Sequence, residues 1–462
     1  MKKLLVANRG EIARRIFRSA RELGTATVAV YSEADANAAH VLEADEAWPI
    51  GPAPARDSYL NVDKVLEAAR LSGADAVHPG YGFLSENADF AEAVEAAGLT
   101  WIGPTPESIR TMGDKQRARA LAEAAGVPIV PGSDRIAPDT AEGIEAAGAE
   151  VGYPLLVKAA AGGGGIGMRR VDDPAKLRET VIATQSMAGK AFGNGSVFLE
   201  RFVPKARHVE IQVFGFGEAG AVHFYERDCS LQRRFQKVIE ESPAPGLPDA
   251  VRNRMTEAAV RLCRHVAYRG AGTVEFIVDA ESFEFFFLEM NTRIQVEHPV
   301  TEMVTGQDLV SLQLRFAAGE IGNLPQDEIS TRGHAIECRL YAENPEKRFM
   351  PSPGTLSVFS LPSAVPGLRI DCGYREGDTV TPFYDPMIAK LIVHGATRDE
   401  ARERAAQALR RLKVDGLRTN RAFLIGCLEN DGFASGDVYT SFIDENLAAL
   451  LGASVEAEPA TP

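Results

Sequence analysis

Residues 288–299 read Leu-Glu-Met-Asn-Thr-Arg-Ile-Gln-Val-Glu-His-Pro, and every second side chain is polar. The side chains of a strand alternate between two faces. One face of a strand here would therefore carry Glu289, Asn291, Arg293, Gln295 and Glu297. A solvated face more often carries Lys, Thr and Ser, so this mixture of acids, amides and a base predicts a binding site. The alternative is the solvated edge of a hairpin.

The residues before this stretch predict a β-hairpin. Its strands would be 273–279 and 283–289, and both contain a glutamate. If the hairpin is symmetric about Ser282, Glu275 lies directly opposite Glu289. Like charges in that position destabilise a hairpin, and a cation between them reverses the sign of the interaction.

The acidic pair and the next amide along the strand form a candidate metal site. Glu275, Glu289 and Asn291 offer only oxygen ligands. Oxygen ligands suit Mg²⁺ or Mn²⁺ rather than zinc. The pattern therefore predicts a hard divalent cation at this end of the alternating segment.

Length and composition indicate an ordinary globular protein of several domains. The chain has 462 residues, of which 45% are hydrophobic and 25% charged, and this length is enough for roughly three domains. The net charge of −14 argues against non-specific binding to nucleic acid or to anionic membranes. A local basic pocket stays compatible with that charge.

The cysteines and the N-terminus predict a cytoplasmic protein. The five cysteines are scattered and include no CxxC pair, so we expect neither a disulfide framework nor a zinc site. The apolar run 4–7 is too short for a signal peptide. No apolar stretch is long enough to span a membrane.

The first 110 or so residues alternate strand and helix signals, which predicts a parallel α/β domain. The helix is expected at about 11–23, and the strands are expected at 4–7, 27–31, 74–78 and 100–103. Glycine- and proline-rich loops follow the last two strands. Ligands of open α/β sheets bind outside such strand ends.

The rest of the chain predicts mixed α+β structure. From Met112 to about Leu324 the pattern combines hairpins with glycine-rich turns. After Pro325 we expect a third region of mixed β structure, with strands at 334–341, 355–359 and 388–394 and a helix at about 398–412. Residues 453–462 are small, acidic and proline-containing, and predict a disordered tail.

A glycine-rich loop lies between two predicted strands, 153–158 and 168–171. It is not a Walker A loop, because no Gly-Lys-Ser/Thr follows. Its backbone N–H groups are able to close over phosphates, although a loop without a ligand is the alternative. Lys158 ends an otherwise apolar strand and favours the phosphate interpretation, since a lysine there needs an anionic partner. Lys115 is a weaker candidate.

A basic segment lies at 226–237. Arg233, Arg234 and Lys237 are candidates for holding an anion such as bicarbonate or phosphate, and a basic loop paired with glutamates is the alternative. Cys229 is interpreted as a packed residue rather than a nucleophile. His208 is either a ligand contact or a structural histidine.

Seven motifs together resemble the ATP-grasp superfamily and, within it, biotin carboxylase. The resemblance covers about residues 2–446. The motifs lie at 7–13, 78–87, 162–168, 207–212, 226–230, 289–302 and 336–339. The run at 289–302 is long and unusual, so the resemblance is specific.

The resemblance implies a reaction and roles for residues. ATP and bicarbonate would give carboxyphosphate, and its CO₂ would pass to biotin on a carrier protein. Glu297 would be the base that deprotonates bicarbonate, and Arg339 would stabilise the biotin enolate and carboxyphosphate. The bicarbonate ligands would be Lys237, Arg293, Gln295 and Val296, and the metal ligands Glu275, Glu289 and Asn291.

The same resemblance implies a nucleotide site. The residues expected to bind ATP are Lys115, Lys158, Gly163, Gly164, Gly165, Glu200, Arg201, Val203, His208, Gln232, Phe235, Ile277 and Leu288. The implied domains are an N-terminal α/β domain (1–113), a central ATP-grasp domain (114–330) with a mobile glycine-rich lid at about 131–203, and a C-terminal mixed β domain (331–446). Residues 447–462 would be a tail.

The chain contains no Ala-Met-Lys-Met-type biotinylation site. We therefore expect a stand-alone subunit of an acetyl-CoA or other acyl-CoA carboxylase, acting with a biotin carboxyl carrier protein and carboxyltransferase subunits. Homodimerisation is implied by the family alone. The alternatives are the same half-reaction serving pyruvate, an ATP-grasp carboxylate–amine ligase, and a nucleotide-binding module without catalysis.

Two departures from the family pattern affect the predicted ATP site. Phe235 stands where many relatives have histidine, and Ile166 occupies a lid position that is often Arg or Lys. We predict that Phe235→His and Ile166→Arg each change the KM for ATP modestly, because each adds a polar or charged contact. Steady-state kinetics at saturating bicarbonate checks this, and an unchanged KM in both variants would refute it.

Overall fold

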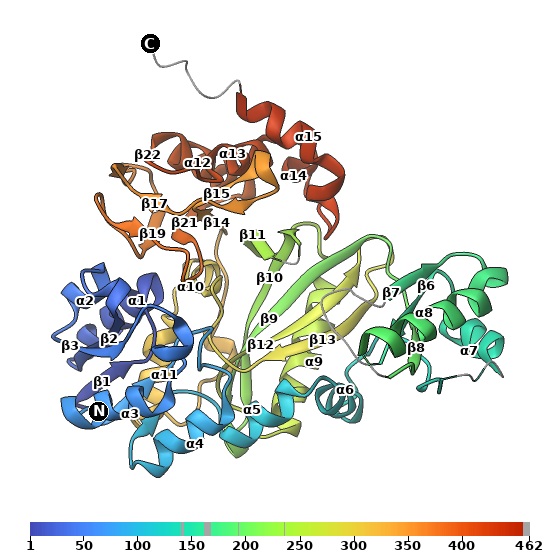
Figure 1. Cartoon of the computed structure of the whole chain (residues 1–462), viewed down its shortest axis with the longest axis horizontal. Coiled ribbons are helices and arrows are strands. Elements are labelled where there is room, and N and C mark those ends of the chain that lie inside the picture. Colours follow the sequence, from blue (N-terminus) through green and yellow to red (C-terminus); the bar gives the residue numbers. More distant parts are fainter. Residues whose placement is uncertain (139, 141–142, 161–167, 193, 235, 456–462) are drawn as a thin grey trace. The chain divides into compact units, whose positions relative to one another are not determined.

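The computed structural model describes residues 1–138, 140, 143–160, 168–192, 194–234 and 236–455. The chain divides into two compact units. The larger unit contains Met1–Val127, Arg207–Phe276 and Glu289–Pro462, and the smaller contains Pro128–Ala206 and Ile277–Leu288. Figure 1 labels the helices and strands along the chain.

The N-terminal part of the larger unit is the predicted parallel α/β structure. Its sheet has the order β3-β2-β1-β4-β5 and all its pairs are parallel. The strands are β1 (Lys3–Val6), β2 (Ala26–Ser32), β3 (Glu46–Gly51), β4 (Ala76–His78) and β5 (Thr100–Trp101). The helices are α1 (Gly10–Glu22), α2 (Ala39–Glu43), α3 (Val62–Ser72), α4 (Ala88–Ala96), α5 (Pro106–Gly113) and α6 (Lys115–Ala124).

Strand β3 was missed from the sequence. It contains Pro49, which cannot donate to a neighbouring strand. The strand lies at the sheet edge, where that loss is tolerated, and only Ile50 of its side chains is buried. Proline at an edge therefore concealed a real strand.

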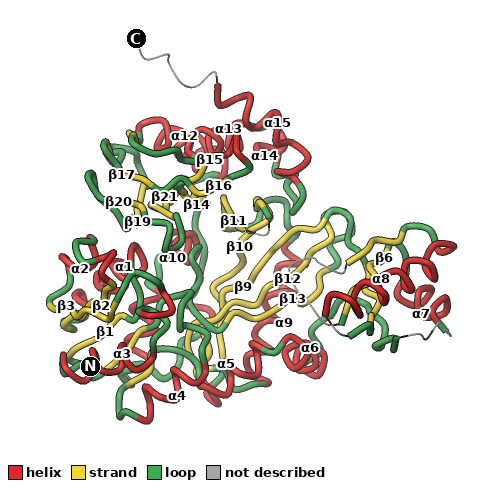
Figure 2. The backbone as a smooth tube through the Cα atoms, viewed as in Figure 1, coloured by secondary structure: helices red, strands yellow, loops and turns green. Residues whose placement is uncertain are grey.

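An eight-stranded sheet carries most of the candidate site, in the order β13-β12-β9-β10-β11-β14-β21-β19. Its strands are β9 (Ala206–Phe216), β10 (Ala221–Arg233), β11 (Gln236–Ser242), β12 (Arg269–Asp279), β13 (Phe285–Asn291), β14 (His334–Tyr341), β19 (Leu368–Cys372) and β21 (Met387–Gly395). Figure 2 shows these strands in yellow, with loops between them in green. Helices α9 (Asp249–His265), α10 (His298–Thr305) and α11 (Leu309–Ala317) accompany them.

The two faces of strand β14 have opposite character. Ile336, Cys338 and Leu340 join a large apolar core, on which α12 (Arg398–Arg411) and α13 (Arg421–Glu429) pack. The alternating residues include the buried charges Glu337 and Arg339. Alternation thus separates an apolar face from a charged one.

The remaining elements of the C-terminal region are short strands and two helices. They are β15 (Glu343–Asn344), β16 (Met350–Pro351), β17 (Gly354–Thr355), β18 (Val358–Ser360), β20 (Thr379–Val380), β22 (Lys413–Asp415), α14 (Asp431–Ser435) and α15 (Phe442–Val455). The single strand predicted at 355–359 is wrong, because β17 and β18 belong to different two-stranded sheets. Between them Leu356 is buried and its N–H donates to the Asp378 carbonyl.

Helix α15 corrects the predicted start of the tail. It runs to Val455, and Leu450 packs in the apolar core. The packed chain therefore extends beyond residue 446. Residues 456–462 of the predicted tail lie outside the described residues.

The strand expected through Glu297 ends at Asn291. Residues 292–297 are irregular, and α10 begins at His298 with Pro299 in its first turn. Directly after the strand, the Thr292 N–H donates to the Glu86 carboxylate at 3.2 Å and not to a strand carbonyl. The prediction of one strand face through residue 297 is therefore wrong.

The hairpin turn is also not centred as predicted. The Asp279 N–H donates to the Glu284 carbonyl, which centres the turn between Glu281 and Ser282 rather than on Ser282. Phe283 follows with a φ of 57°. The Asp279 carboxylate accepts from the backbone N–H groups of Glu281 and Ser282, so this side chain fixes the turn.

The smaller unit is built on an antiparallel sheet of order β7-β6-β8. Its strands are β6 (Leu155–Ala159), β7 (Met168–Val171) and β8 (Val197–Arg201), and its helices are α7 (Ile144–Val151) and α8 (Leu177–Phe192). Lys158 pairs with Met168, so the two strands predicted on either side of the glycine-rich loop are confirmed. Most of that loop, including Gly162, Ile166 and Gly167, lies outside the described residues.

Candidate active site

A largely buried lysine, with 13% of its side chain exposed, joins three carboxylates in the larger unit. The Lys237 ammonium on β11 lies 2.7 Å from Glu210, 3.1 Å from Glu275 and 2.6 Å from Glu297. Burial alone would lower the pKa of Lys237, but negative charges around it, among them the three carboxylates, hold that pKa well above its usual value. Lys237 is therefore a fixed positive charge.

Glu297 is held between two cations. One oxygen accepts from Lys237, and the other accepts from Arg339 at 2.9 Å. Burial would raise the pKa of this carboxyl, but Lys237, Arg339 and Arg227 hold it well below its usual value. Glu297 is thus an ionised carboxylate in a site almost closed to water, with 1% of its side chain exposed.

Arg339 bridges two acids with one guanidinium nitrogen. Its Nη2 lies 2.5 Å from Glu240 and 2.9 Å from Glu297. Burial raises the pKa of Glu240 to about 7 although Arg339 lowers it. The carbonyl of Arg339 accepts from the Asn420 amide, which fixes the strand at this point.

The ammonium of Lys237 also contacts Glu275, which is one of the three predicted metal ligands. The Asn291 amide donates to Glu275 at 2.8 Å. Burial raises the pKa of Glu289, and the negative charge of Glu275 raises it further, against the effect of Lys115 at 3.8 Å. Two carboxylates that repel each other fit a divalent cation, which would remove that repulsion.

Two other clusters have metal-like composition but are already neutralised. They are His208, Glu210 and Glu275, and Glu210, Cys229 and Glu297. Lys237 contacts a carboxylate of both. Lys237 also contacts Glu275 of the predicted site, but Glu289 pairs instead with the exposed Lys115 at 3.8 Å. The pair that includes Glu289 is therefore the better candidate.

Arg293 and Gln295 come together on the irregular segment after β13. The Arg293 guanidinium donates to Gln295 at 2.7 Å, to Asn291 at 3.1 Å and to Glu86 at 3.1 Å. The Gln295 amide donates to Glu275 at 3.3 Å. The bend after Asn291 therefore keeps these groups in one connected network.

Sequence reasoning missed Arg227 as a site residue. It is fully buried on β10, and its guanidinium donates to Glu210, Gln212, Thr273 and Thr301. The sequence signal for this cluster was the alternation of the polar residues Glu210 and Gln212 on β9. A solvated strand edge gives the same alternation, so only the long-range partners identify the cluster.

The other nucleotide-site candidates of the larger unit lie near this cluster. His208 Nε2 is 3.0 Å from Glu275. Burial would lower the pKa of His208, but Glu275 raises it above its usual value. Gln232 is buried and pairs with Lys237 across β10 and β11.

Cys229 fits its interpretation as a packed residue. It is fully buried, and its thiol is 3.8 Å from Glu297. Burial and the surrounding carboxylates hold the pKa of this thiol well above its usual value, so it is not a nucleophile.

The smaller unit contains a second pair of predicted residues. The Lys158 ammonium on β6 donates to Glu200 on β8 at 2.5 Å, and the two residues lie on neighbouring strands. Arg201 donates to the Val151 carbonyl at 3.2 Å. Three other candidates of this unit, Val203, Ile277 and Leu288, are partly exposed or exposed.

Four predicted nucleotide residues cannot be placed. Gly163, Gly164, Gly165 and Phe235 lie outside the described residues. Arg234, a candidate from the basic segment, directly follows β10. It is exposed and has a φ of 46°. Arg233 instead forms a buried ion pair with Glu343.

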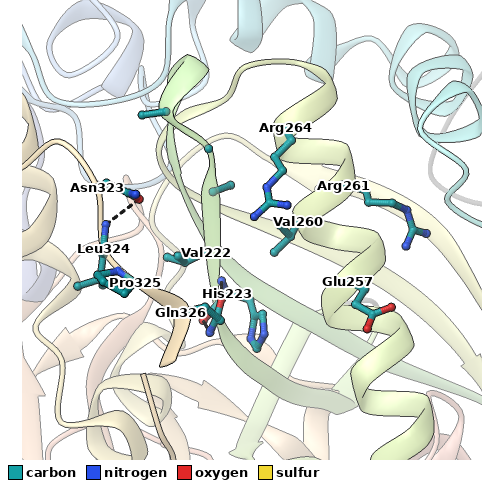
Figure 3. Close-up of a pocket in the computed structure, with 13 residues that line it drawn as sticks. Val222, His223, Glu257, Val260, Arg261, Arg264, Asn323, Leu324, Pro325 and Gln326 are labelled. Atoms are coloured by element: carbon teal, nitrogen blue, oxygen red, sulfur yellow. Dashed lines mark hydrogen bonds between the residues drawn. The ribbon is translucent and has the colours of Figure 1, made fainter. Parts of the chain in front are cut away.

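A pocket of about 510 Å³ lies in the larger unit, apart from these residues (Figure 3). Val222, Val260, Leu324 and Pro325 form its apolar part, and side chains of α9 supply charge. None of the predicted site residues lines it. The candidate active site is therefore the charged cluster and not this pocket.

Family comparisons cover nearly the whole chain. Residues 1–109 match "Biotin carboxylase, N-terminal domain", residues 114–325 match "Carbamoyl-phosphate synthase L chain, ATP binding domain", and residues 337–445 match "Biotin carboxylase C-terminal domain". The match and the charged site define an ATP-dependent ligase of the ATP-grasp type.

Individual relatives narrow this class. Biotin carboxylase 1 of Bacillus subtilis is 50% identical over 96% of this chain and 98% of its own length. Methylcrotonoyl-CoA carboxylase subunit alpha of Oryza sativa is 49% identical over 99% of this chain but only 62% of its own length. The chain belongs to the biotin carboxylase family.

A solved structure supports the same conclusion. The biotin carboxylase domain dimer of Hydrogenobacter thermophilus 2-oxoglutarate carboxylase, in complex with MgADP, ADP and bicarbonate, has a TM-score of 0.86 and 43% identity. It covers 97% of this chain and 98% of that one. The protein catalyses the ATP-dependent carboxylation of biotin with bicarbonate. In the described part of the chain, no helix is long and apolar enough to cross a membrane.

The buried network around Arg227 generates a stability prediction. Arg227→Met removes the guanidinium that contacts Glu210 at 2.6 Å, so we expect the free energy of unfolding to fall by about 3–5 kcal/mol. Urea unfolding followed by circular dichroism measures it. Arg70→Met is the control, because Arg70 pairs with Glu67 on the exposed face of α3. Equal loss in both variants would contradict a dominant role for the buried network.

Proposed function

We propose that Glu297 is the base that deprotonates bicarbonate, with Lys237, Arg293, Gln295 and Val296 as bicarbonate ligands. The observation that carries this proposal is the pairing of one buried carboxylate with two fixed cations. Lys237 and Arg339 keep Glu297 ionised, so it is ready to accept a proton. Neutral glutamic acid could not act as a base.

The low pKa of Glu297 changes when the substrate arrives. Bicarbonate is an anion, and when it binds beside Lys237 its negative charge offsets part of the stabilisation that Lys237 gives to ionised Glu297. The proton affinity of Glu297 then rises. The base is therefore weak without substrate and becomes stronger when a proton is available to transfer.

The proposed roles give the following sequence of steps. The proton of bicarbonate moves to Glu297, and the resulting oxygen attacks the γ-phosphorus of ATP as the bond to the β-phosphate oxygen breaks. The products are carboxyphosphate and ADP. Carboxyphosphate splits into CO₂ and phosphate, the phosphate takes the N1 proton of biotin, and N1 bonds to the carbon of CO₂. Arg339 stabilises the negative charge that develops on the biotin ureido oxygen when N1 loses its proton. Arg293 and Gln295 orient the planar anion.

We further propose that Glu275, Glu289 and Asn291 hold Mg²⁺ or Mn²⁺. When bound, the ion would neutralise negative charge on the ATP phosphates. Its site is linked to the bicarbonate ligands because Lys237 and Gln295 both contact Glu275.

Nucleotide contacts are proposed separately for each unit. In the larger unit they are Lys115, His208, Gln232 and Phe235. In the smaller unit they are Lys158, Gly163, Gly164, Gly165, Glu200, Arg201, Val203, Ile277 and Leu288. The division into domains at 113 and 330, with a lid at about 131–203, stays a prediction.

The complete complex is proposed to carboxylate acetyl-CoA or another acyl-CoA. Relatives named after methylcrotonoyl-CoA and 2-oxoglutarate share this domain, so the acceptor is selected outside it. A pyruvate-directed complex is the second candidate. The carboxylate–amine ligase is not favoured, because it does not require the Glu297–Arg339 pair.

We propose that the protein acts as a homodimer in the cytoplasm, with a biotin carboxyl carrier protein and carboxyltransferase subunits. The dimeric Hydrogenobacter relative supports the assembly, and five buried free cysteines suit a reducing compartment. Light scattering after size-exclusion chromatography should give twice the mass of one chain. The mass of a single chain at micromolar concentration would contradict the dimer.

Glu297→Gln tests the proposed base. The amide keeps the shape of the side chain but cannot accept the proton, so we expect bicarbonate-dependent ADP formation to fall by about 10²- to 10⁴-fold. The dissociation constant for ATP, measured by isothermal titration calorimetry, should stay near that of the wild type.

The wild-type assay provides the reference. ADP formation should depend on bicarbonate and should rise with biotin. An unchanged turnover number in Glu297→Gln would eliminate it as the base. Dependence on neither substrate in the wild type would instead reject the proposed reaction.

A further inference from the structure

A second buried lysine contacts the segment that carries the proposed base. Lys390 on β21 is fully buried. Its ammonium donates to the main-chain carbonyl of Val296 at 2.8 Å, one residue before Glu297. Lys390 also pairs with Arg339 across β14 and β21. Lys390 therefore contacts the segment of Glu297 and lies opposite Arg339, although it is not among the proposed bicarbonate ligands.

The carbonyl of Val296 is on an irregular segment. Residues 292–297 belong to no strand or helix, so neighbouring strands do not fix their main chain. In the described part of the chain, the Val296 carbonyl accepts a hydrogen bond from Lys390. The position of the following side chain, Glu297, depends on where this peptide group lies.

Acids on three other elements, α1, β14 and β19, interact with the Lys390 ammonium. The acid on β19 is Asp371, which pairs with Lys390 in the register of β19 and β21. Glu11 on α1 is 3.3 Å away. Burial raises the pKa of Glu11 to about 7, and the positive charge of Lys390 opposes that rise. Burial also holds the pKa of Glu337 on β14 well above its usual value, again opposed by Lys390. The Tyr81 ring centroid is 6.0 Å from the ammonium on another side.

A fully buried ammonium is costly unless charge and hydrogen bonds compensate for lost water. Hydrophobic residues of similar volume would fill this position on the strand at lower cost. The lysine is the choice that adds a directed donor to the Val296 carbonyl. Strand β21 lies between β14 and β19 in the sheet, so the donor has a fixed origin.

We propose that Lys390, supported by Glu11, is a positioning residue that fixes the Val296–Glu297 peptide so that Glu297 meets bicarbonate in the reactive geometry. This inference rests on the proposed role of Glu297. Lys390 acts through the main chain and does not touch the substrate. Misplacement of a reacting group by a fraction of an ångström lowers a rate without loss of nucleotide binding.

Lys390→Met tests the proposal, because methionine has similar length and no ammonium. We expect the turnover number for bicarbonate-dependent ADP formation to fall on the order of tenfold and the KM for bicarbonate to rise. The KM for ATP and the dissociation constant for ADP should stay within twofold. A purely structural lysine would change all these values together or none.

Arg398→Met is the matched control. Arg398 is a largely buried cation on α12 that pairs with Glu241 on β11 and donates to the Ala434 and Phe433 carbonyls. Within the described residues, its hydrogen bonds and ion pairs do not involve residues 292–297. We expect this variant to lower the unfolding temperature while its KM for bicarbonate stays within twofold of the wild type.

Glu11→Gln keeps the experiment decisive if Lys390→Met does not fold. It retains the ammonium but removes its carboxylate partner, so the KM for bicarbonate should rise and the KM for ATP should not. An unchanged KM for bicarbonate in Glu11→Gln, or in folded Lys390→Met, would overturn the proposal. Loss of bicarbonate dependence in the wild type would instead reject the reaction itself.

Discussion

The site depends on one buried ammonium, that of Lys237, which three carboxylates share. Glu210 comes from β9, Glu275 from β12 and Glu297 from the segment before α10. Without the cation, three negative charges at this separation could not all persist away from water. Strand order, the bend after β13 and the start of α10 all bring an acid to this one point. The larger unit is organised around that neutralisation.

The two faces of the large sheet explain how so many charges are buried without unfolding the domain. One face of β14 joins the apolar core under α12 and α13. The other carries Glu337 and Arg339, while Lys390 on β21 pairs with Arg339 across the strands. Apolar burial on one face stabilises the sheet, so the other face is free to hold a network selected for chemistry. Arg227 completes this network from β10.

The sequence predicted more of the chemistry than of its geometry. Alternating polarity at 289–297 identified Glu297 correctly as part of the charged cluster, but periodicity could not show that β13 ends at Asn291. Extended residues in a loop keep the same spacing as a strand. Arg227 was not predicted as a site residue, because its role is defined by four partners that are distant in sequence. Roles for individual residues came from family resemblance, since no local pattern distinguishes a base from a buried ion-pair partner.

The bend after Asn291 changes the meaning of the alternating segment. A straight strand would have carried metal ligands and bicarbonate ligands on one rigid face. In the structure the proposed metal ligands end a strand, and Arg293, Gln295 and Glu297 follow on irregular backbone. Side chains must therefore join the two halves. Lys237 does so by contacting both Glu275 and Glu297, and Gln295 does so through Glu275. One ammonium contacts both a proposed metal ligand and the proposed base. If bicarbonate binds beside Lys237 as proposed, it would therefore change the electrostatic environment of both carboxylates together. In this proposal, the binding of bicarbonate itself raises the proton affinity of Glu297.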